Sequence, residues 1–293
     1  MLARIRVTEI FFDIDGAGLI PDGPRLREKP TAFLIHGGPG ADHSIFKPIG
    51  PMLTERLQVV YFDHRGSGRS ARGDPSKYTL DENVEDMETL RRYLGLGPIV
   101  SIGASYGGMV AMAHAARYPD AVSHLVLAVT AAHAGHIDRA RQLVRERGTP
   151  EQIAACEDLY AGRLDTPAKL LRYHEVTGPL YSMKFDAERA RDARARLTVS
   201  PEALNRGYAP GGCLRSFDLR PELRLIKAPT LIMAGRHDWM CAPEYSEEIH
   251  RHIPGSDLRI FEESGHSIFG DEQRQALDVL ADFVVYNSLA AAQ

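Results

Sequence analysis

The sequence predicts an α/β fold with a mostly parallel central sheet and helices on both of its faces. Short apolar runs rich in β-branched residues alternate with amphipathic helical stretches along most of the chain. Several of these runs end in polar, glycine-rich loops, and one long helical stretch interrupts the alternation before it resumes. Sheets of this kind bind ligands at the carboxyl ends of their strands, so functional residues are expected in those loops.

The composition is that of an ordinary globular protein. At 293 residues the chain is long enough to bury a sizeable core, either as one domain or as one large domain with an insertion. Its 35 Lys and Arg residues against 39 Asp and Glu residues give a net charge of -4. Because there is no basic surplus and no motif that reads RNA or DNA, we expect neither nucleic acid nor an anionic membrane as a partner.

Cysteine usage and the first residues indicate a cytoplasmic protein. Cys156, Cys213 and Cys241 are odd in number and widely scattered, which argues against a disulfide framework or a zinc site. Residues 1–6 lead directly into an alternating strand pattern, without the apolar core and small-residue cleavage site of a signal peptide. No apolar run approaches the roughly 18 to 20 residues of a membrane span. We therefore expect a soluble, intracellular chain with reduced thiols.

The first 130 residues are expected to form the first part of the sheet domain. Residues 4–13 partly alternate between apolar and polar side chains, which predicts one or two antiparallel strands at a sheet edge, and a link rich in glycine and proline follows over residues 16–30. Acids open residues 80–94 and arginines close them, as in an amphipathic helix charged to suit its own dipole. Further strands are expected at residues 31–35, 57–62, 99–102 and 122–129.

The middle of the chain breaks this alternation. Residues 131–220 contain helical segments separated by proline-containing breaks such as residues 148–150 and 178–179, and they lack a strong strand. We interpret them as a helical cap that covers the strand ends, inserted between the two core parts, residues 1–130 and 221–293. The sheet pattern resumes with strands at residues 228–234 and 258–261 and helices at residues 244–252 and 272–286.

A Gly-x-Ser-x-Gly sequence occupies residues 103–107, between an expected strand and an alanine-rich helical stretch. That context is typical of a nucleophile elbow, a tight turn that exposes a serine hydroxyl above the strand end. Ser105 is therefore the candidate nucleophile, and the backbone N–H of Tyr106 is a candidate oxyanion donor. The pentapeptide alone also fits an inert glycine-rich connection, so the rest of the chain has to supply its partners.

A second glycine-rich loop, His-Gly-Gly-Pro-Gly at residues 36–40, follows the expected strand at residues 31–35. Glycine lets the backbone approach a ligand closely. In hydrolases with a nucleophile elbow, a loop of this type supplies the second oxyanion donor. We assign that role to the N–H of Gly38, although the loop alone also fits a plain turn.

Asp238 and His266 are the expected partners of the serine. A serine hydroxyl needs a base within hydrogen-bond reach, and the base needs a third group to orient it. Both residues follow expected strands, and the chain order Ser, Asp, His is that of hydrolases with a nucleophile elbow. Asp238 could instead cap a helix, and His237 or Asp271 could be mistaken for the true members.

Neither a metal ion nor a phosphate-binding loop is expected. His250 and His252 are two residues apart on an expected helix and therefore face different sides, and the other histidines lack ligand spacing. Residues 103–108 lack the Lys-Ser/Thr end of a phosphate loop. We therefore expect no metal and no cofactor.

Five motifs together resemble one known family. They are His-Gly-Gly-Pro-Gly at residues 36–40, Asp-His-Arg-Gly-Ser-Gly-Arg-Ser at 63–70, Gly-Ala-Ser-Tyr-Gly-Gly at 103–108, Gly-Arg-His-Asp at 235–238 and Ser-Gly-His at 264–266. In these motifs the chain is similar to the proline iminopeptidases and related aminopeptidases of the α/β-hydrolase superfamily. The resemblance covers the core and is weakest in the cap. It implies the α/β-hydrolase fold and release of an N-terminal residue, often proline, without metal or cofactor.

One departure from that family concerns the substrate's α-amino group. Peptidases of the family hold this cationic group with acidic residues, because burying an ammonium without a partner is costly. In the cap, where some relatives carry a glutamate, residues 205–208 read Asn-Arg-Gly-Tyr. Glu175 is a candidate substitute for substrate binding, although an exposed helical glutamate fits it as well.

The leading hypothesis is a serine hydrolase that acts through an acyl-enzyme on a small molecule or short peptide, most like a proline iminopeptidase. A carboxylesterase or lactonase with the same machinery is the alternative, since it needs no amine anchor. A non-catalytic small-molecule receptor is a third, from another class. The sequence leaves the acyl group, the leaving group and the oligomeric state open.

Overall fold

The expected α/β fold is present, with one large sheet at its centre. The structure is a computed structural model that describes residues 1–290, with side chains through residue 284. In spatial order, the eight strands of the sheet are β1 (Leu2–Ile5), β2 (Thr8–Asp15), β6 (Gln58–Phe62), β5 (Thr31–Ile35), β7 (Ile99–Ala104), β8 (Val122–Ala128), β9 (Thr230–Gly235) and β10 (Asp257–Phe261).

Six of the eight strands are parallel, so their carboxyl ends meet at one edge of the sheet. Among β6, β5, β7, β8, β9 and β10, each strand pairs in parallel with its neighbour. The pairs β1 with β2 and β2 with β6 are antiparallel, which confirms the antiparallel strands expected near the N-terminus. The loops singled out from the sequence therefore all leave the sheet at the same edge.

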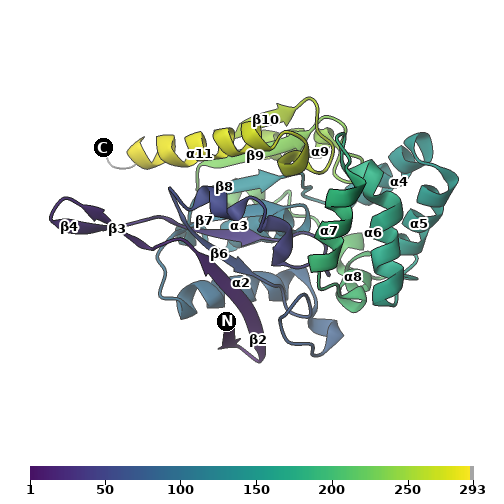
Figure 1. Cartoon of the computed structure of the whole chain (residues 1–293), viewed down its shortest axis with the longest axis horizontal. Helices are drawn as coiled ribbons and strands as arrows, with labels where there is room; N and C mark the ends of the chain where they lie inside the picture. The colour runs from purple at the N-terminus through teal and green to yellow at the C-terminus, as the bar shows by residue number, and fades with distance from the viewer. Residues whose placement is uncertain (291–293) are drawn as a thin grey trace.

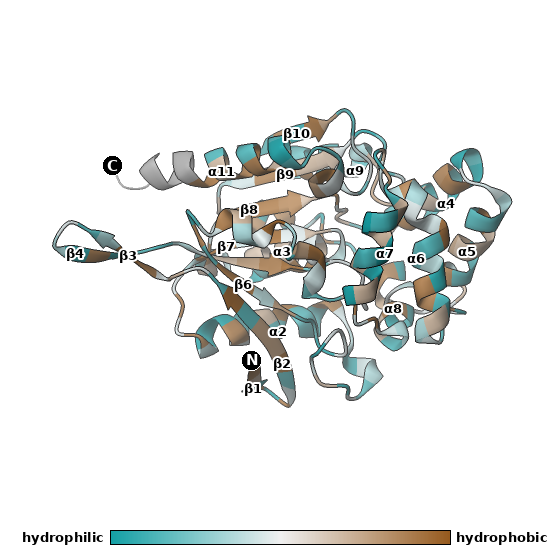
Figure 2. Cartoon of the chain, in the orientation of Figure 1, coloured by the Kyte–Doolittle hydropathy of each residue, from teal (hydrophilic) through white to brown (hydrophobic). Residues whose placement is uncertain are grey.

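Helices cover both faces of the sheet, and each face buries its own hydrophobic cluster. On one face lie α2 (Leu80–Tyr93), α3 (Tyr106–Arg117) and α9 (Pro243–His252); on the other lie α1 (Gly50–Leu53) and α11 (Gln273–Ala290). Met87 of α2 and Leu280 of α11 are fully buried, which stabilises the fold by about 1.5 to 3 kcal/mol for each such side chain. Figure 2 shows the apolar central strands between these helices.

Five helices gather beyond the carboxyl ends of the strands, at one end of the molecule (Figure 1). They are α4 (Gly135–Arg147), α5 (Pro150–Tyr160), α6 (Pro167–Tyr181), α7 (Ala187–Arg196) and α8 (Pro201–Tyr208). We call these five helices and their connections the helical layer. Residues 178–179, expected to separate helices, lie inside α6, because a proline in the last turn costs only one backbone hydrogen bond there. The proposed domain boundaries stay a prediction.

Three features of the chain differ from expectation or add to it. The link expected over residues 16–30 forms a hairpin of β3 (Leu19–Asp22) and β4 (Arg25–Glu28), which projects from the body in Figure 1. All four β4 residues are exposed, so no alternation of buried side chains marked this hairpin in the sequence. A short helix, α10 (Ile268–Asp271), also follows the last strand. The 3-10 helices span His43–Phe46, Pro75–Lys77, Pro119–Ala121, Cys213–Arg215 and Leu223–Leu225.

None of the helices within the described residues is both long and apolar enough to cross a membrane.

Candidate active site

Ser105 occupies a tight turn between β7 and α3, as a nucleophile elbow requires. Its φ of 56° and ψ of -123° lie in a region that side-chain-bearing residues rarely adopt. Gly103 and Gly107 make the turn possible, because a Cβ atom on Gly103 would collide with the carbonyl of Gly107, and one on Gly107 with that of Ile35. These two close contacts explain why the motif has glycine at both positions that flank the serine.

Hydrogen bonds from the end of β8 and from the loop after it hold the strained serine in place. The Ser105 N–H donates to the carbonyl of Ala128 at 2.9 Å, and the Thr130 hydroxyl donates to the Ser105 carbonyl at 2.7 Å. A residue in a sparsely populated conformation costs about 1 to 3 kcal/mol, so it persists only where its surroundings fix it. Thr130 does part of that fixing, and nothing in the sequence pointed to it.

His266 and Asp238 come together above the ends of β10 and β9. The His266 Nδ1–H donates to Asp238 Oδ2 at 2.8 Å, which leaves Nε2 as the acceptor of the ring. Asp238 is 1% exposed, and its Oδ1 accepts the N–H groups of Met240 at 2.8 Å and Cys241 at 3.0 Å. Helix α9 begins later, with Ala242 at its N-cap, so Asp238 is not the cap of that helix.

The loop at residues 36–40 packs against the serine. A Cβ atom on Gly37 would lie 3.1 Å from the Ser105 Cβ, so the backbone of the loop lies directly beside Ser105. Gly38 has a φ of 118° and lines the same cavity as Ser105. Tyr106 is the first residue of α3, where a backbone N–H has no acceptor within its own helix. The oxyanion roles of Gly38 and Tyr106 stay predictions.

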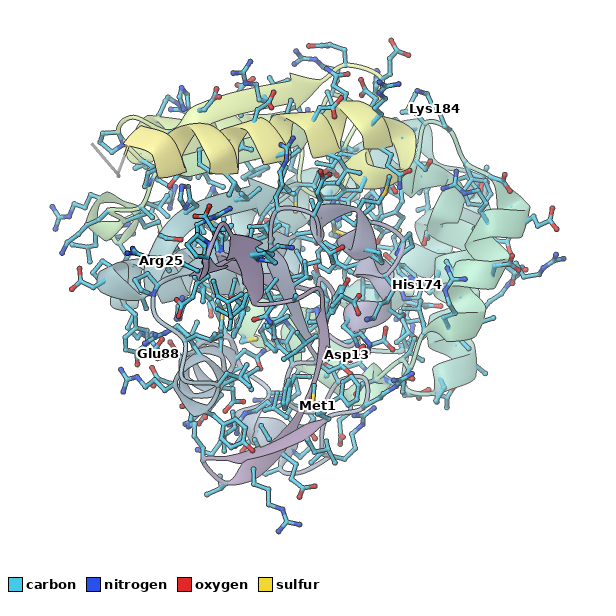
Figure 3. The ribbon with its side chains drawn as sticks, turned by 60° about the vertical axis from the view of Figure 1, so that its left-hand side comes forward. Met1, Asp13, Arg25, Glu88, His174 and Lys184 are labelled. Atoms are coloured by element: carbon cyan, nitrogen blue, oxygen red, sulfur yellow. The ribbon has the colours of Figure 1, made fainter. Side chains whose placement is uncertain are left out.

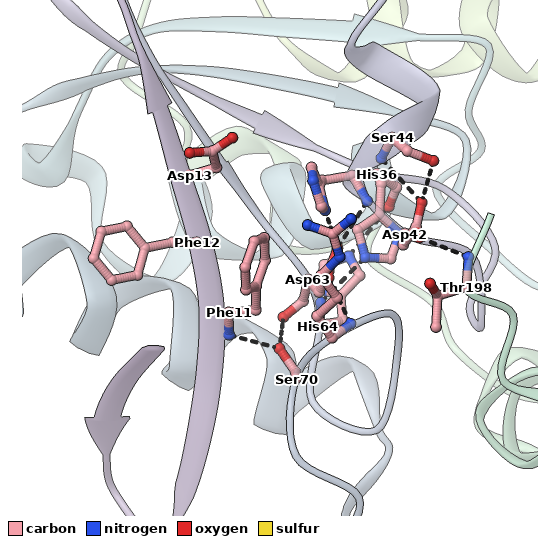
Figure 4. Close-up of polar contacts among 12 residues, drawn as sticks. Phe11, Phe12, Asp13, His36, Asp42, Ser44, Asp63, His64, Ser70 and Thr198 are labelled. Atoms are coloured by element: carbon pink, nitrogen blue, oxygen red, sulfur yellow. Dashed lines mark hydrogen bonds and ion pairs between the residues drawn. The ribbon is translucent and has the colours of Figure 1, made fainter. Parts of the chain in front are cut away.

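Two buried carboxylates, Asp42 and Asp63, fix the segment that directly follows this loop (Figure 4). Asp63 accepts both the backbone N–H and the Nδ1–H of His43, each at 2.8 Å. Burial alone would raise the pKa of Asp63, but the His43 hydrogen bond and the nearby His36 ring outweigh it and hold that pKa below its ordinary value. Asp42 accepts the N–H of Thr198 at 2.8 Å, which ties the loop to the helical layer.

An apolar cavity of about 300 Å³ separates these groups from the helical layer. Ser105, His266 and Gly38 line the sheet side of it. The helical layer contributes Leu159, Tyr173, His174, Tyr181, Leu204 and Tyr208. No Asp, Glu, Lys or Arg is among the residues that line the cavity within the described part of the chain.

His174, labelled in Figure 3, brings an imidazole from α6 to the cavity. Its ring packs against Tyr173 and makes no hydrogen bond with the residues that the structure describes. Burial, with a smaller contribution from Arg194, lowers the pKa of His174 to about 4. The imidazole is therefore neutral at pH 7, and the helical side of the cavity carries no charge.

Glu175 is not among the residues that line the cavity, so the cavity lends no support to its expected substrate-binding role, which stays a prediction. Its side chain is 53% exposed and pairs with Arg172 at 2.7 Å. Successive residues on a helix point about 100° apart, so Glu175 faces away when its neighbour His174 lines the cavity. The exposed-glutamate alternative is the one that the structure supports.

Two further features of the site gave no sequence signal. Val129 lines the cavity with a φ of 45°, an unusual conformation for a β-branched residue, in the loop directly after β8. Asp271, weighed only as a rival for the catalytic aspartate, is buried behind the His266 loop and does not contact the imidazole. Among residues 1–290, no group of three or more His, Cys, Asp or Glu side chains is arranged to hold a metal ion.

Comparisons with known proteins agree with this architecture. The model of the alpha/beta hydrolase fold family matches residues 30–273. Proline iminopeptidase PfmaB of Pestalotiopsis fici is 31% identical over 88% of this chain and 92% of that protein, and proline iminopeptidase of Saccharolobus solfataricus is 28% identical over 85% and 83%.

Solved structures give the same fold. Proline iminopeptidase of Mycobacterium smegmatis superposes with a TM-score of 0.78 over 99% of both chains, at 21% identity. An esterase of Exiguobacterium antarcticum superposes with a TM-score of 0.72 over 96% of both chains, at 24% identity. An enol-lactonase of Burkholderia xenovorans gives 0.69 over 97% of this chain and 100% of that one, at 24% identity.

Proposed function

Because the chain belongs to the alpha/beta hydrolase fold family and is a hydrolase, we propose that it is a cofactor-independent serine hydrolase that works through an acyl-enzyme. One observation carries the proposal: Ser105 and His266, from loops 161 residues apart, line the same cavity, and His266 is held by Asp238 at 2.8 Å. A serine in a nucleophile elbow and an oriented imidazole that line one cavity are the groups that nucleophilic catalysis needs.

In this mechanism Ser105 Oγ attacks a substrate carbonyl while His266 Nε2 takes its proton. Asp238 keeps the proton of the ring on Nδ1 and stabilises the imidazolium that forms. The N–H groups of Gly38 and Tyr106 bind the oxyanion, where one such donor typically contributes about 2.7 to 4 kcal/mol. His266 then protonates the leaving group, and water, activated by the same imidazole, releases the acyl group.

The cavity favours a neutral, apolar acyl group. An ammonium ion taken out of water without a partner is strongly disfavoured, and no carboxylate lines this cavity within the described residues. Tyrosine and leucine side chains supply an apolar wall, and the neutral His174 adds one group able to hydrogen-bond without charge. These features support a carboxylesterase or lactonase that acts on small esters.

Release of an N-terminal residue, as by a proline iminopeptidase, is the second candidate function. The names of the two relatives described above and the loop at residues 36–40 support it. That reaction would require a partner for the α-amino group, and Glu175 does not supply one because it is exposed and paired with Arg172. The second candidate therefore requires that the α-amino group of the substrate be held outside the cavity described here.

Two aryl esters with the same leaving group distinguish these functions. Cyclopentanecarboxylate and proline esters have acyl groups of nearly the same shape. At neutral pH the proline ring carries a protonated amine where the cyclopentane ring has an uncharged CH₂ group. We expect kcat/KM for the cyclopentane ester to be at least about tenfold higher, which corresponds to 1.4 kcal/mol. A preference for the proline ester, together with turnover of prolyl-arylamides, would establish the second candidate instead.

The Ser105→Ala variant is the matched control for both esters. Turnover that survives in this variant would count against the serine mechanism altogether. Binding without turnover in the unmodified protein would point to the third alternative, a small-molecule receptor.

A further inference from the structure

Asp271, at the end of α10, joins two segments that are far apart in the sequence. It is 5% exposed, and both of its carboxylate oxygens are occupied. Oδ1 accepts the Ser182 hydroxyl and the N–H of Lys184, the latter at 3.1 Å. Oδ2 accepts the N–H of Met183 at 3.0 Å and that of Gly265 at 2.9 Å. One buried carboxylate thus binds the segment that follows α6 and the loop that carries the catalytic base.

Tyr181, the last residue of α6 and the neighbour of the segment held by Asp271, packs on the imidazole. The Tyr181 ring meets the His266 ring edge-on, with centroids 5.4 Å apart. The Ser267 N–H donates to the Tyr181 carbonyl at 2.9 Å, and a Cβ atom on Gly265 would lie 2.8 Å from that same carbonyl. The residues on both sides of His266 are therefore in contact with the end of α6, and the position of the ring depends on that contact.

We propose that Asp271 is a positioning residue of the hydrolase: it holds the end of α6 against the His266 loop and thereby keeps the imidazole aligned with Ser105. This inference rests on the proposed function. It assigns to the helical layer a part in catalysis in addition to shaping the cavity. Asp271 itself touches neither the substrate cavity nor the imidazole.

The occupied oxygens exclude Asp271 as the orienting member of the triad. His266 Nδ1 already donates to Asp238 Oδ2 at 2.8 Å, and every hydrogen bond that the Asp271 carboxylate accepts comes from a backbone N–H or from the Ser182 hydroxyl. A carboxylate suits this position because an amide has a single acceptor oxygen, and in either orientation its NH₂ group would face at least one of the backbone N–H donors. The Lys184 ammonium also donates to the Asp271 carbonyl at 2.9 Å, where the helical layer meets the C-terminal helices (Figure 3).

The test is the kinetic effect of Asp271→Asn, measured well below the unfolding temperature of the variant. A misplaced catalytic group can cost about a hundredfold in rate. We expect kcat for a good ester substrate to fall by about that factor while KM changes less than about threefold, because the cavity wall stays in place. Asp257→Asn is the matched control: it removes one carboxylate from an exposed pair with Arg259, and its kcat should not change.

Ser182→Ala is a second, milder variant for the case in which Asp271→Asn fails to fold. It removes one of the four donors and should lower kcat by a smaller factor, and combined with Asp271→Asn it should cause no further loss.

Two outcomes of the kinetic test would overturn the proposal. A folded Asp271→Asn variant that melts earlier but keeps its kcat would show that Asp271 only braces the fold. A variant whose KM rises while kcat is kept would assign Asp271 to substrate binding.

Reaction of a fluorophosphonate with the unmodified protein separates this inference from the proposed function. If Ser105 is not labelled, the proposed function has failed, and this inference fails with it. If Ser105 is labelled at the same rate in Asp271→Asn, the positioning role alone has failed.

Discussion

The two sides of the cavity differ in how their residues are held and in what they offer a substrate. On the sheet side, Ser105, Asp238 and His266 lie on loops at strand ends, and hydrogen bonds fix Ser105 through its backbone and Asp238 and His266 through their side chains. On the helical side, apolar and aromatic residues form a wall with one neutral imidazole, His174. Under the proposed function, bond cleavage depends on the sheet side and the choice of acyl group on the helical side, so substitutions should separate the two.

The largest effect is expected on the sheet side, from Asp238→Asn. An amide at this position can hydrogen-bond the wrong tautomer of His266, so that Nε2 no longer accepts the serine proton, and in a serine protease triad such a change costs about 10⁴ in kcat. We expect a loss of that order, measured with an aryl ester under saturating substrate. A loss below tenfold would show that the carboxylate is not the group that orients His266.

An intermediate effect is expected when a carboxylate is placed on the helical side. His174→Glu puts a negative charge in the cavity wall, and His174→Gln is its neutral control with the same side-chain length. We expect the Glu variant to raise kcat/KM for the proline ester relative to the cyclopentane ester by about tenfold over the Gln variant, a gain of 1.4 kcal/mol from pairing the ammonium. If both variants show the same ratio of the two rates, the wall does not select the acyl group by charge.

A smaller effect is expected on the pH dependence of stability. Burial lowers the pKa of His174 in the folded state to about 4, whereas the unfolded imidazole has a pKa near 6.5. The folded chain therefore binds fewer protons between these values, so this contribution to stability is complete above about pH 6.5 and is lost as the pH falls toward 4.

Urea unfolding of the unmodified protein and of His174→Gln, each at pH 7 and pH 5, measures that contribution. The unmodified protein should lose more unfolding free energy between the two pH values than the Gln variant does. Equal losses would show that His174 is as accessible to protons in the folded state as in the unfolded one.

The smallest effect is expected from Glu175→Gln, on the outer side of α6. The side chain is exposed and its pair with Arg172 lies in solvent, so the pair contributes little to stability and nothing to the cavity. We expect kcat/KM for ester and proline substrates alike to stay within about twofold of the unmodified protein. A selective loss on the proline ester would establish Glu175 as a substrate-binding residue and would erase the difference between the two sides.

Sequence reasoning succeeded where local chemistry determines the result. The strand at Thr31–Ile35 has the predicted bounds, and Gly103 fits because its closest contact is the carbonyl of Gly107, four residues along the same turn. The order of Ser105, Asp238 and His266 after parallel strands predicted that they share one edge of the sheet, and Asp238 and His266 are indeed hydrogen-bonded.

Sequence reasoning is insufficient where packing between distant segments decides. Glu175 and His174 are neighbours on one helix, and only the angle at which α6 meets the sheet decides which of them faces the cavity. Asp271 carries no motif, because its four donors come from residues 182–184 and Gly265. The exposed hairpin of β3 and β4 lacks the buried face from which strand patterns are recognised.

The most direct test of the account is covalent labelling of the unmodified protein by a fluorophosphonate, followed by mass spectrometry of its peptides. The account predicts one phosphonyl adduct per chain, on Ser105, with reaction abolished in Ser105→Ala and slowed in Asp238→Asn. No adduct on Ser105, or equal labelling in Ser105→Ala, would contradict it.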